Sequence, residues 1–199
     1  MAIGTVALLV IPWAPAVGQS VRAGLIGGAP LTNGFQAVTE LGPPGGPFST
    51  ANVPTTRGYA AGGFVELDLP GNWMVEFDTL YRPLRYGARS VYPTGSLGSA
   101  SPSSVITWEF PVLGEYRFRL PWMSPFVGAG PSFRASGNNV GGAWPSNHGI
   151  AAEVGGIASV KWLRISPCLR YTRWAQDRYP GLYGRTRQDQ VELLLGLSF

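Results

Sequence analysis

The only histidine of the chain, His148, limits the catalytic chemistry that the sequence can support. Ser146 lies two residues before it, and a serine activated by a histidine is a common nucleophile of acyl-transfer enzymes. Asp177 is the nearest candidate for the acid partner, judged by its position between two predicted strands. Because Ser146 and His148 stand among asparagines, a solvated loop is the favoured interpretation, and we predict no catalytic residue.

Carboxylates recur two residues apart, as in Glu66 with Asp68 and Glu76 with Asp78. Residues at this spacing share one face of a strand, so each pair could act as general acid and base. Arginines such as Arg117 occupy the same kind of position in other segments. We therefore favour a structural role, in which acids and bases pair with one another in a protein interior.

Cofactor and metal chemistry find little support. The single cysteine, Cys168, excludes an intramolecular disulfide, and it is not adjacent to the single histidine. Gly128-Ala129-Gly130 is a weak match to a nucleotide-binding loop and lacks the strand-to-helix context that such a loop requires. We predict no cofactor and no metal site.

The composition narrows the choice of partners. Only 13% of the residues are charged, the net charge is +4, and there are 28 glycines and 18 prolines. Soluble domains carry about 25% charged residues. The basic residues are spread along the chain without a cluster, so nucleic acid is not an expected partner.

The candidate residues belong to segments whose hydrophobicity alternates with a period of two, which indicates strands with one apolar and one polar face. In the third segment, for example, Trp73, Val75 and Phe77 alternate with Glu76 and Asp78. Eight such segments are predicted, at residues 21–31, 58–69, 73–86, 105–120, 125–134, 150–160, 163–172 and 191–199.

Short and long connections alternate between these segments. Tight turns are predicted at 70–72, around Pro121 and at 161–162, whereas the connections at about 32–57, 87–104, 135–148 and 175–187 are long and rich in Gly, Pro, Ser and Asn. Aromatic residues stand near the ends of the segments. These patterns predict an all-β fold: an eight-stranded antiparallel up-and-down transmembrane β-barrel with short periplasmic turns and long extracellular loops.

The first residues carry an export signal by composition. An apolar run over 3–11 is followed by small and helix-breaking residues, and it is too short to cross a bilayer as a helix. Ala16 and Gly18 suit cleavage before Gln19. The prediction is a signal peptide at 1–18 and one barrel domain at 19–199.

The chain resembles the small eight-stranded outer-membrane barrels of the OmpA and OmpX type across residues 20 to 199. Glu192, Leu197 and Phe199 fall where that family's C-terminal assembly signal has a polar residue and two hydrophobic or aromatic residues. The glycine usual in that signal would fall at Leu194, whereas here it is Gly196. The resemblance implies that the barrel-assembly machinery recognises the last strand.

A second resemblance concerns Ser146 and His148. Their spacing is similar, in reversed order, to the His-x-Ser arrangement of outer-membrane lipid A deacylases, which are also eight-stranded. This resemblance implies an alternative function as a lipid-modifying enzyme at the outer leaflet.

The polar faces of the eight segments collect acids and bases, which we expect to form a charge network in the barrel lumen because an unpaired charge away from water is costly. Its predicted members are Arg22, Glu66, Asp68, Glu76, Asp78, Arg82, Glu109, Glu115, Arg117, Arg119, Glu153, Arg164, Arg170 and Glu192.

The sequence thus predicts a non-enzymatic protein of the bacterial outer membrane with a plugged, charged lumen. Its role would be structural or would depend on binding by the loops, with a narrow gated channel as a further alternative. The expected partners are outer-membrane lipids, the barrel-assembly machinery and an extracellular ligand at the loops.

Overall fold

The computed structural model describes residues 20–41, 49–53, 58–91, 101–121, 123–137, 145–177 and 185–198. The predicted signal segment 1–18, Trp122 and Phe199 lie outside these ranges. Among the described residues, no helix is long and apolar enough to span a membrane.

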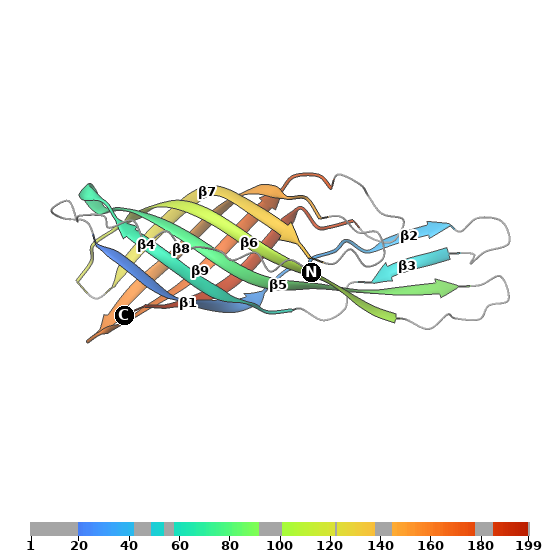
Figure 1. The fold of residues 1–199 in the computed structure, drawn as a ribbon, viewed down its shortest axis with the longest axis horizontal. Coiled ribbons are helices and arrows are strands. Elements are labelled where there is room, and N and C mark those ends of the chain that lie inside the picture. The colour runs from blue at the N-terminus through green and yellow to red at the C-terminus, as the bar shows by residue number, and fades with distance from the viewer. Residues whose placement is uncertain are drawn as a thin grey trace, which may run out of the picture.

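Eight antiparallel strands close into a barrel, which Figure 1 shows from the side. They are β1 (Val21–Pro30), β4 (Ala60–Asp68), β5 (Trp73–Val91), β6 (Ser101–Arg117), β7 (Ser124–Ser136), β8 (His148–Val160), β9 (Leu163–Trp174) and β10 (Asp189–Ser198). Neighbours along the chain pair in order, and β1 closes the barrel against β10. Each predicted segment corresponds to one of these strands, so the predicted fold class is confirmed.

Two of the three tight turns owe their geometry to residues in the left-handed region of the backbone map. Between β4 and β5, the short 3₁₀ turn η1 (Pro70–Asn72) has positive φ at Gly71 (77°) and Asn72 (70°). Between β8 and β9, Lys161 has φ 57°. We call the end of the barrel with these turns the turn side and the opposite end the loop side.

The loop side contains strands that the sequence interpretation assigned to loops. Within 32–57 the chain forms β2 (Val38–Leu41) and β3 (Ser49–Val53), and β3 pairs with the end of β5 from Gly87 to Val91. The connection predicted at 87–104 is also too long, since β5 continues to Val91 and β6 begins at Ser101. In Figure 1 these segments extend beyond the barrel as a continuous sheet.

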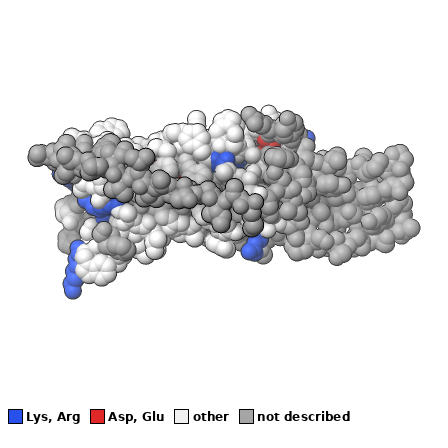
Figure 2. Space-filling view, in the orientation of Figure 1, with Lys and Arg blue, Asp and Glu red and all other residues white. Residues whose placement is uncertain are grey.

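The period of two divides the side chains between the outside and the lumen. Large apolar side chains are exposed on the outside of every barrel strand, among them Leu25, Val65, Phe77, Trp108, Val127, Val154, Leu169 and Leu195. Figure 2 shows few charged residues on the described wall of the barrel. Ten charged side chains among the described residues instead face inward and are buried.

Outward-facing aromatic rings form two contact groups at different heights of the wall. The turn-side group contains Trp73, Tyr116 and Phe118, and the loop-side group contains Tyr59, Tyr81 and Trp108. Along β5, Trp73 and Tyr81 are separated by about 27 Å at about 3.4 Å per residue. For a strand tilt near 40° this is about 21 Å along the barrel axis, close to the height of about 25 Å of the apolar band in membrane barrels.

The sequence predicted a polar, charged lumen, but part of the lumen is apolar. Buried apolar side chains from seven strands pack against one another inside it: Ile26, Ala60, Phe64, Leu80, Phe126, Ile157, Cys168 and Leu194. The Cys168 thiol is part of this cluster and is free. Apolar packing and buried ion pairs therefore fill the barrel together.

Candidate functional site

The polar and charged side chains of the lumen form three groups along the barrel. The turn-side cluster contains Arg22, Glu66, Asp68, Arg117 and Arg164. The central acidic cluster contains Glu76, Asp78, Glu115, Glu153 and Arg170. The loop-side cluster contains Arg82, Glu109, Arg134, Gln190 and Glu192. Each cluster joins strands that are distant in sequence, which requires the closed barrel.

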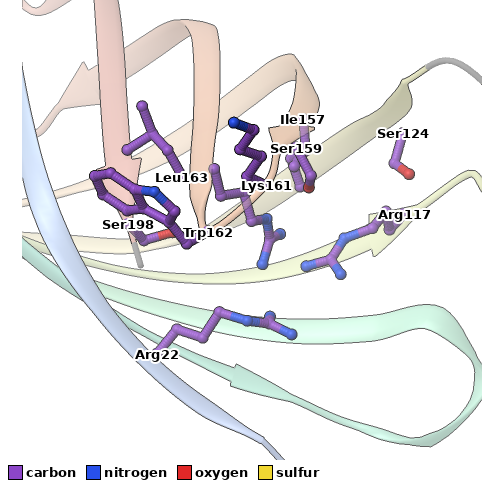
Figure 3. A pocket seen from close by; sticks show the side chains of 10 residues that line it. Arg22, Arg117, Ser124, Ile157, Ser159, Lys161, Trp162, Leu163 and Ser198 are labelled. Carbon is purple, nitrogen blue, oxygen red and sulfur yellow. The ribbon is translucent and has the colours of Figure 1, made fainter.

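The turn-side cluster borders a cavity of about 270 Å³, shown in Figure 3. Asp68 accepts hydrogen bonds from Arg22 (2.6 Å) and Arg117 (3.2 Å), and Glu66 accepts one from Arg164 (2.9 Å). Lys161 also lines the cavity. This end of the lumen therefore holds four basic side chains, Lys161 included, against the carboxylates of Glu66 and Asp68, which is a surplus of positive charge.

In the central acidic cluster, one guanidinium serves three carboxylates. Arg170 donates to Glu153 (2.8 Å), to Glu76 (3.0 Å) and, through a very short hydrogen bond, to Asp78. The Arg170 side chain is 1% exposed, so its guanidinium is shielded from bulk water. The fourth carboxylate, Glu115, is 0% exposed.

The loop-side cluster is balanced in charge. Glu109 accepts hydrogen bonds from Arg134 at 2.9 and 3.1 Å, and Arg82 lies 3.4 Å from Glu109 and 3.2 Å from Glu192. Gln190 accepts hydrogen bonds from both arginines. All four charged side chains are at most 4% exposed.

Two further contacts hold Arg134 in place. The indole of Trp174 donates to Gln190 at 2.8 Å, and the Arg134 guanidinium carbon lies 3.6 Å from the centre of the Trp174 ring. A guanidinium stacked on an aromatic face gains cation–π attraction, most strongly where water is excluded. Trp174 therefore belongs to the loop-side cluster, and its parity with Arg170 and Thr172 on β9 was the available sequence signal.

Thirteen of the predicted network residues lie in these three clusters. Arg119 lies two residues beyond the end of β6, and its side chain is exposed. Arg134 was expected on the polar, inward face of its segment and joins the network there, whereas the uncharged Gln190, on the polar face of β10, was absent from the predicted network.

Ser146 and His148, the residues of the enzymatic alternative, are not hydrogen-bonded to each other in the structure. Ser146 is buried, and its Oγ has no hydrogen-bond partner among the described residues. His148 is exposed, and its Nδ1 lies 2.9 Å from the Asn147 side-chain oxygen. Asp177 accepts hydrogen bonds from the Ser146 and Thr186 backbone amides. A Ser–His mechanism needs the serine hydroxyl bonded to the imidazole, and this contact is missing here.

The residues of the predicted assembly signal divide between the two faces of β10. Glu192 is 2% exposed and faces Arg82 in the lumen. Leu197 has the opposite parity and pairs with Leu25 of β1 and Ile165 of β9. Phe199 lies outside the described residues. In the closed barrel, Glu192 is inaccessible to a partner.

No family model and no curated protein matches the sequence. Among solved structures, the chain is similar to Neisserial surface protein A, with 14% identity and a TM-score of 0.54, over 91% of this chain and 97% of that one. It is also similar to the outer membrane protein OprG from Pseudomonas aeruginosa, with 14% identity and a TM-score of 0.51, over 90% of this chain and 94% of that one. Both are small eight-stranded outer-membrane β-barrels, so the predicted resemblance is confirmed for the fold.

Proposed function

We propose that the chain is an integral protein of the bacterial outer membrane that works by binding at its loop side, without catalysis and without an open pore. The apolar outer wall supports the location, because side chains such as Leu25 (65% exposed) and Ile150 (67% exposed) would face water in a soluble protein. The two aromatic groups, about 21 Å apart along the axis, suit the interfaces of a bilayer.

The loop-side cluster is the observation that carries the proposal of a closed lumen. It joins side chains of β5, β6, β7, β9 and β10 across the barrel. An eight-stranded barrel has an interior just wide enough for its own side chains, so one such layer suffices to close it. Conduction would require at least one buried arginine to leave its carboxylate.

The sheet beyond the barrel supports binding at the loop side. A membrane strand needs about 9 to 11 residues, whereas β5 has 19 and β6 has 17. With β2 and β3 they form a four-stranded extension that barrel closure does not require. Loops on a rigid scaffold commonly carry binding functions, and strand pairing makes this one rigid.

Planar bilayer recordings test the closed lumen. We expect no stable channels from the folded protein. The double variant Arg82→Ala with Arg134→Ala removes both guanidinium groups of the loop-side cluster and should give conducting steps. Persistent large steps from the unchanged protein would contradict the proposal.

Membrane fractionation tests the location, with electrophoresis before and after boiling to identify the folded barrel. Deleting residues 38–53, which include β2 and β3, should leave the outer-membrane fraction and the migration of the folded form unchanged. Loss of the folded form would mean that the extension serves the barrel itself instead of a partner.

A further inference from the structure

The central acidic cluster carries an imbalance of charge that protein groups do not correct. Glu76, Asp78, Glu115 and Glu153 face one another in the lumen, and Arg170 is the one cation in contact with them among the described residues. All four carboxylates are at most 7% exposed. An uncompensated buried charge costs several kcal/mol, so the cluster requires further positive charge or protons.

Arg170 cannot neutralise the remaining carboxylate oxygens, because its three side-chain nitrogens already contact other carboxylates. Nε, Nη1 and Nη2 contact Glu153, Asp78 and Glu76, respectively. Four buried carboxylate oxygens remain without a hydrogen-bond partner: Oδ1 of Asp78, Oε1 of Glu153, and both Oε atoms of Glu115. Glu115 is therefore a fully buried side chain to which no described protein group donates a hydrogen bond, and its neighbours in the cluster are other carboxyl groups.

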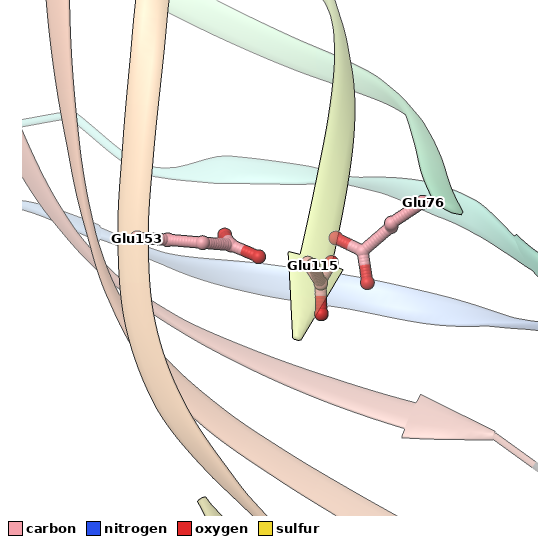
Figure 4. A group of neighbouring side chains, drawn as sticks. All are labelled: Glu76, Glu115 and Glu153. Carbon is pink, nitrogen blue, oxygen red and sulfur yellow. The ribbon is translucent and has the colours of Figure 1, made fainter. Parts of the chain in front are cut away.

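The backbone brings Glu115 and Glu153 together over a glycine. In the sheet register, Glu115 of β6 and Glu153 of β8 both pair with Gly128 of β7, one from each side. A Cβ at position 128 would lie 2.5 Å from Cγ of Glu115 and 3.3 Å from Cγ of Glu153. The missing side chain is what allows the two carboxylates to converge, and Figure 4 shows Glu76 approaching from the other side.

We propose that Glu76, Glu115 and Glu153 form a binding site for one divalent cation that prefers oxygen ligands, with Ca²⁺ as the best fit. Ligand oxygens of the three residues lie within 4.8 Å of one another. Oxygens on opposite sides of Ca²⁺ are about 4.6 to 5.2 Å apart, whereas those of Mg²⁺ are about 4.2 Å apart. Separations of up to 4.8 Å are within the span of Ca²⁺ and exceed that of Mg²⁺.

The electrostatics of the lumen indicate when the ion would bind. The turn-side cluster has surplus positive charge and repels cations, and the loop-side cluster blocks the other approach. We therefore expect Ca²⁺ to enter as the strands assemble and to exchange slowly afterwards. The inference depends on the barrel fold and not on the proposed location or on loop binding.

Equilibrium dialysis against radioactive Ca²⁺ tests binding directly. Barrel refolded in the presence of Ca²⁺ should retain about one ion per chain, as expected for a single carboxylate site. The same protein boiled before dialysis should retain none. If the folded protein retains no Ca²⁺, protons neutralise the cluster and the proposal is wrong.

Variants separate a specific site from general attraction to acidic groups. Glu115→Gln keeps the shape but removes the charge, so it should abolish Ca²⁺ retention and should unfold at a higher denaturant concentration than the unchanged protein when both are in chelator. Glu192→Gln removes a buried carboxylate from the loop-side cluster and should retain Ca²⁺. Equal retention by both variants would overturn the assignment.

A third variant tests the convergence over Gly128 without removing any carboxylate. In Gly128→Ala the new methyl group displaces Glu115, so Ca²⁺ retention should fall at least tenfold while the folded form persists in electrophoresis. Undiminished retention would show that the convergence of Glu115 and Glu153 does not create the site. Should this variant fail to fold, the Glu115→Gln and Glu192→Gln pair still decides the matter.

Discussion

The central acidic cluster and the loop-side cluster are built from similar residue types, but they differ in how far their buried charges are balanced. In the loop-side cluster, Arg82 and Arg134 balance the charges of Glu109 and Glu192, and Gln190 and Trp174 add hydrogen bonds, although Arg82 Nη2, Arg134 Nη1 and Glu192 Oε1 have no hydrogen-bond partner among the described residues. In the central acidic cluster, Arg170 alone faces four carboxylates. A balanced buried network can close a lumen by itself, whereas an unbalanced one depends on something from solution.

Removing the only central cation should have the largest effect. Arg170→Met breaks three ion pairs at once and leaves only carboxylates in the cluster. Breaking one buried pair costs about 3 to 5 kcal/mol, so we expect a loss in free energy of unfolding above that range, or no folded barrel. Denaturant titration in lipid vesicles measures it. A loss below about 2 kcal/mol would mean that Arg170 is not needed to hold the carboxylates, contrary to the comparison.

The balanced cluster should tolerate a paired replacement. Arg134→Met alone strands Glu109 beside a single arginine and should cost about 3 kcal/mol. Adding Glu109→Gln leaves Arg82 paired with Glu192. The double variant should recover about 1 kcal/mol of the lost free energy of unfolding. A double-mutant cycle by the same titration gives the coupling. If the two losses simply add, then the pair of Arg134 and Glu109 is not the unit that the geometry indicates.

The outer wall offers a contrast with the charged interior. Phe77 is 44% exposed and lies midway between Trp73 and Tyr81 on β5. Phe77→Arg should cost about 2 to 4 kcal/mol more than Phe77→Ala in vesicles, because it places a charge near the middle of the bilayer.

Val160, next to the turn at Lys161, is the matched control for depth. Val160→Arg should cost about 0 to 1 kcal/mol more than Val160→Ala, since side chains near the interface reach water. Equal penalties at Phe77 and Val160 would contradict a wall that faces lipid.

The smallest effect is expected at the loop side of β8. His148→Ala should leave the lipid A of an expressing strain unchanged by mass spectrometry, because Ser146 Oγ does not contact the imidazole and Asp177 is bonded to backbone amides. Its Ca²⁺ retention should also match that of the unchanged protein. An altered lipid A spectrum that His148→Ala abolishes would establish the enzymatic alternative.

The faces of the strands could be predicted from sequence, whereas the partners across the lumen could not. Alternation alone assigned Leu193 and Leu195 to one face of the last strand, and both are exposed outward. Leu194 between them is 1% exposed and packs in the lumen, an inward position that its apolar side chain does not indicate.

Contacts across the barrel depend on the stagger of the strands. Arg170 of β9 meets Asp78 of β5, two strands that are not neighbours in the sheet. Strand pairing over such distances leaves no local trace in the sequence. The strands β2 and β3 were missed for a related reason: each has at most five residues and pairs with a segment interpreted as a loop.

The pairing of β1 with β10 constrains how the chain folds. Gly24 lies opposite Ser198 and Pro30 opposite Glu192, so the first and last described strands meet at one seam. Until β10 is in place, both β1 and β9 present unpaired edges, which invite association with other chains. Such non-local pairing has high contact order and closes slowly. The barrel should therefore acquire its stability in one late cooperative step, and an intermediate lacking only β10 should be the species most prone to aggregation.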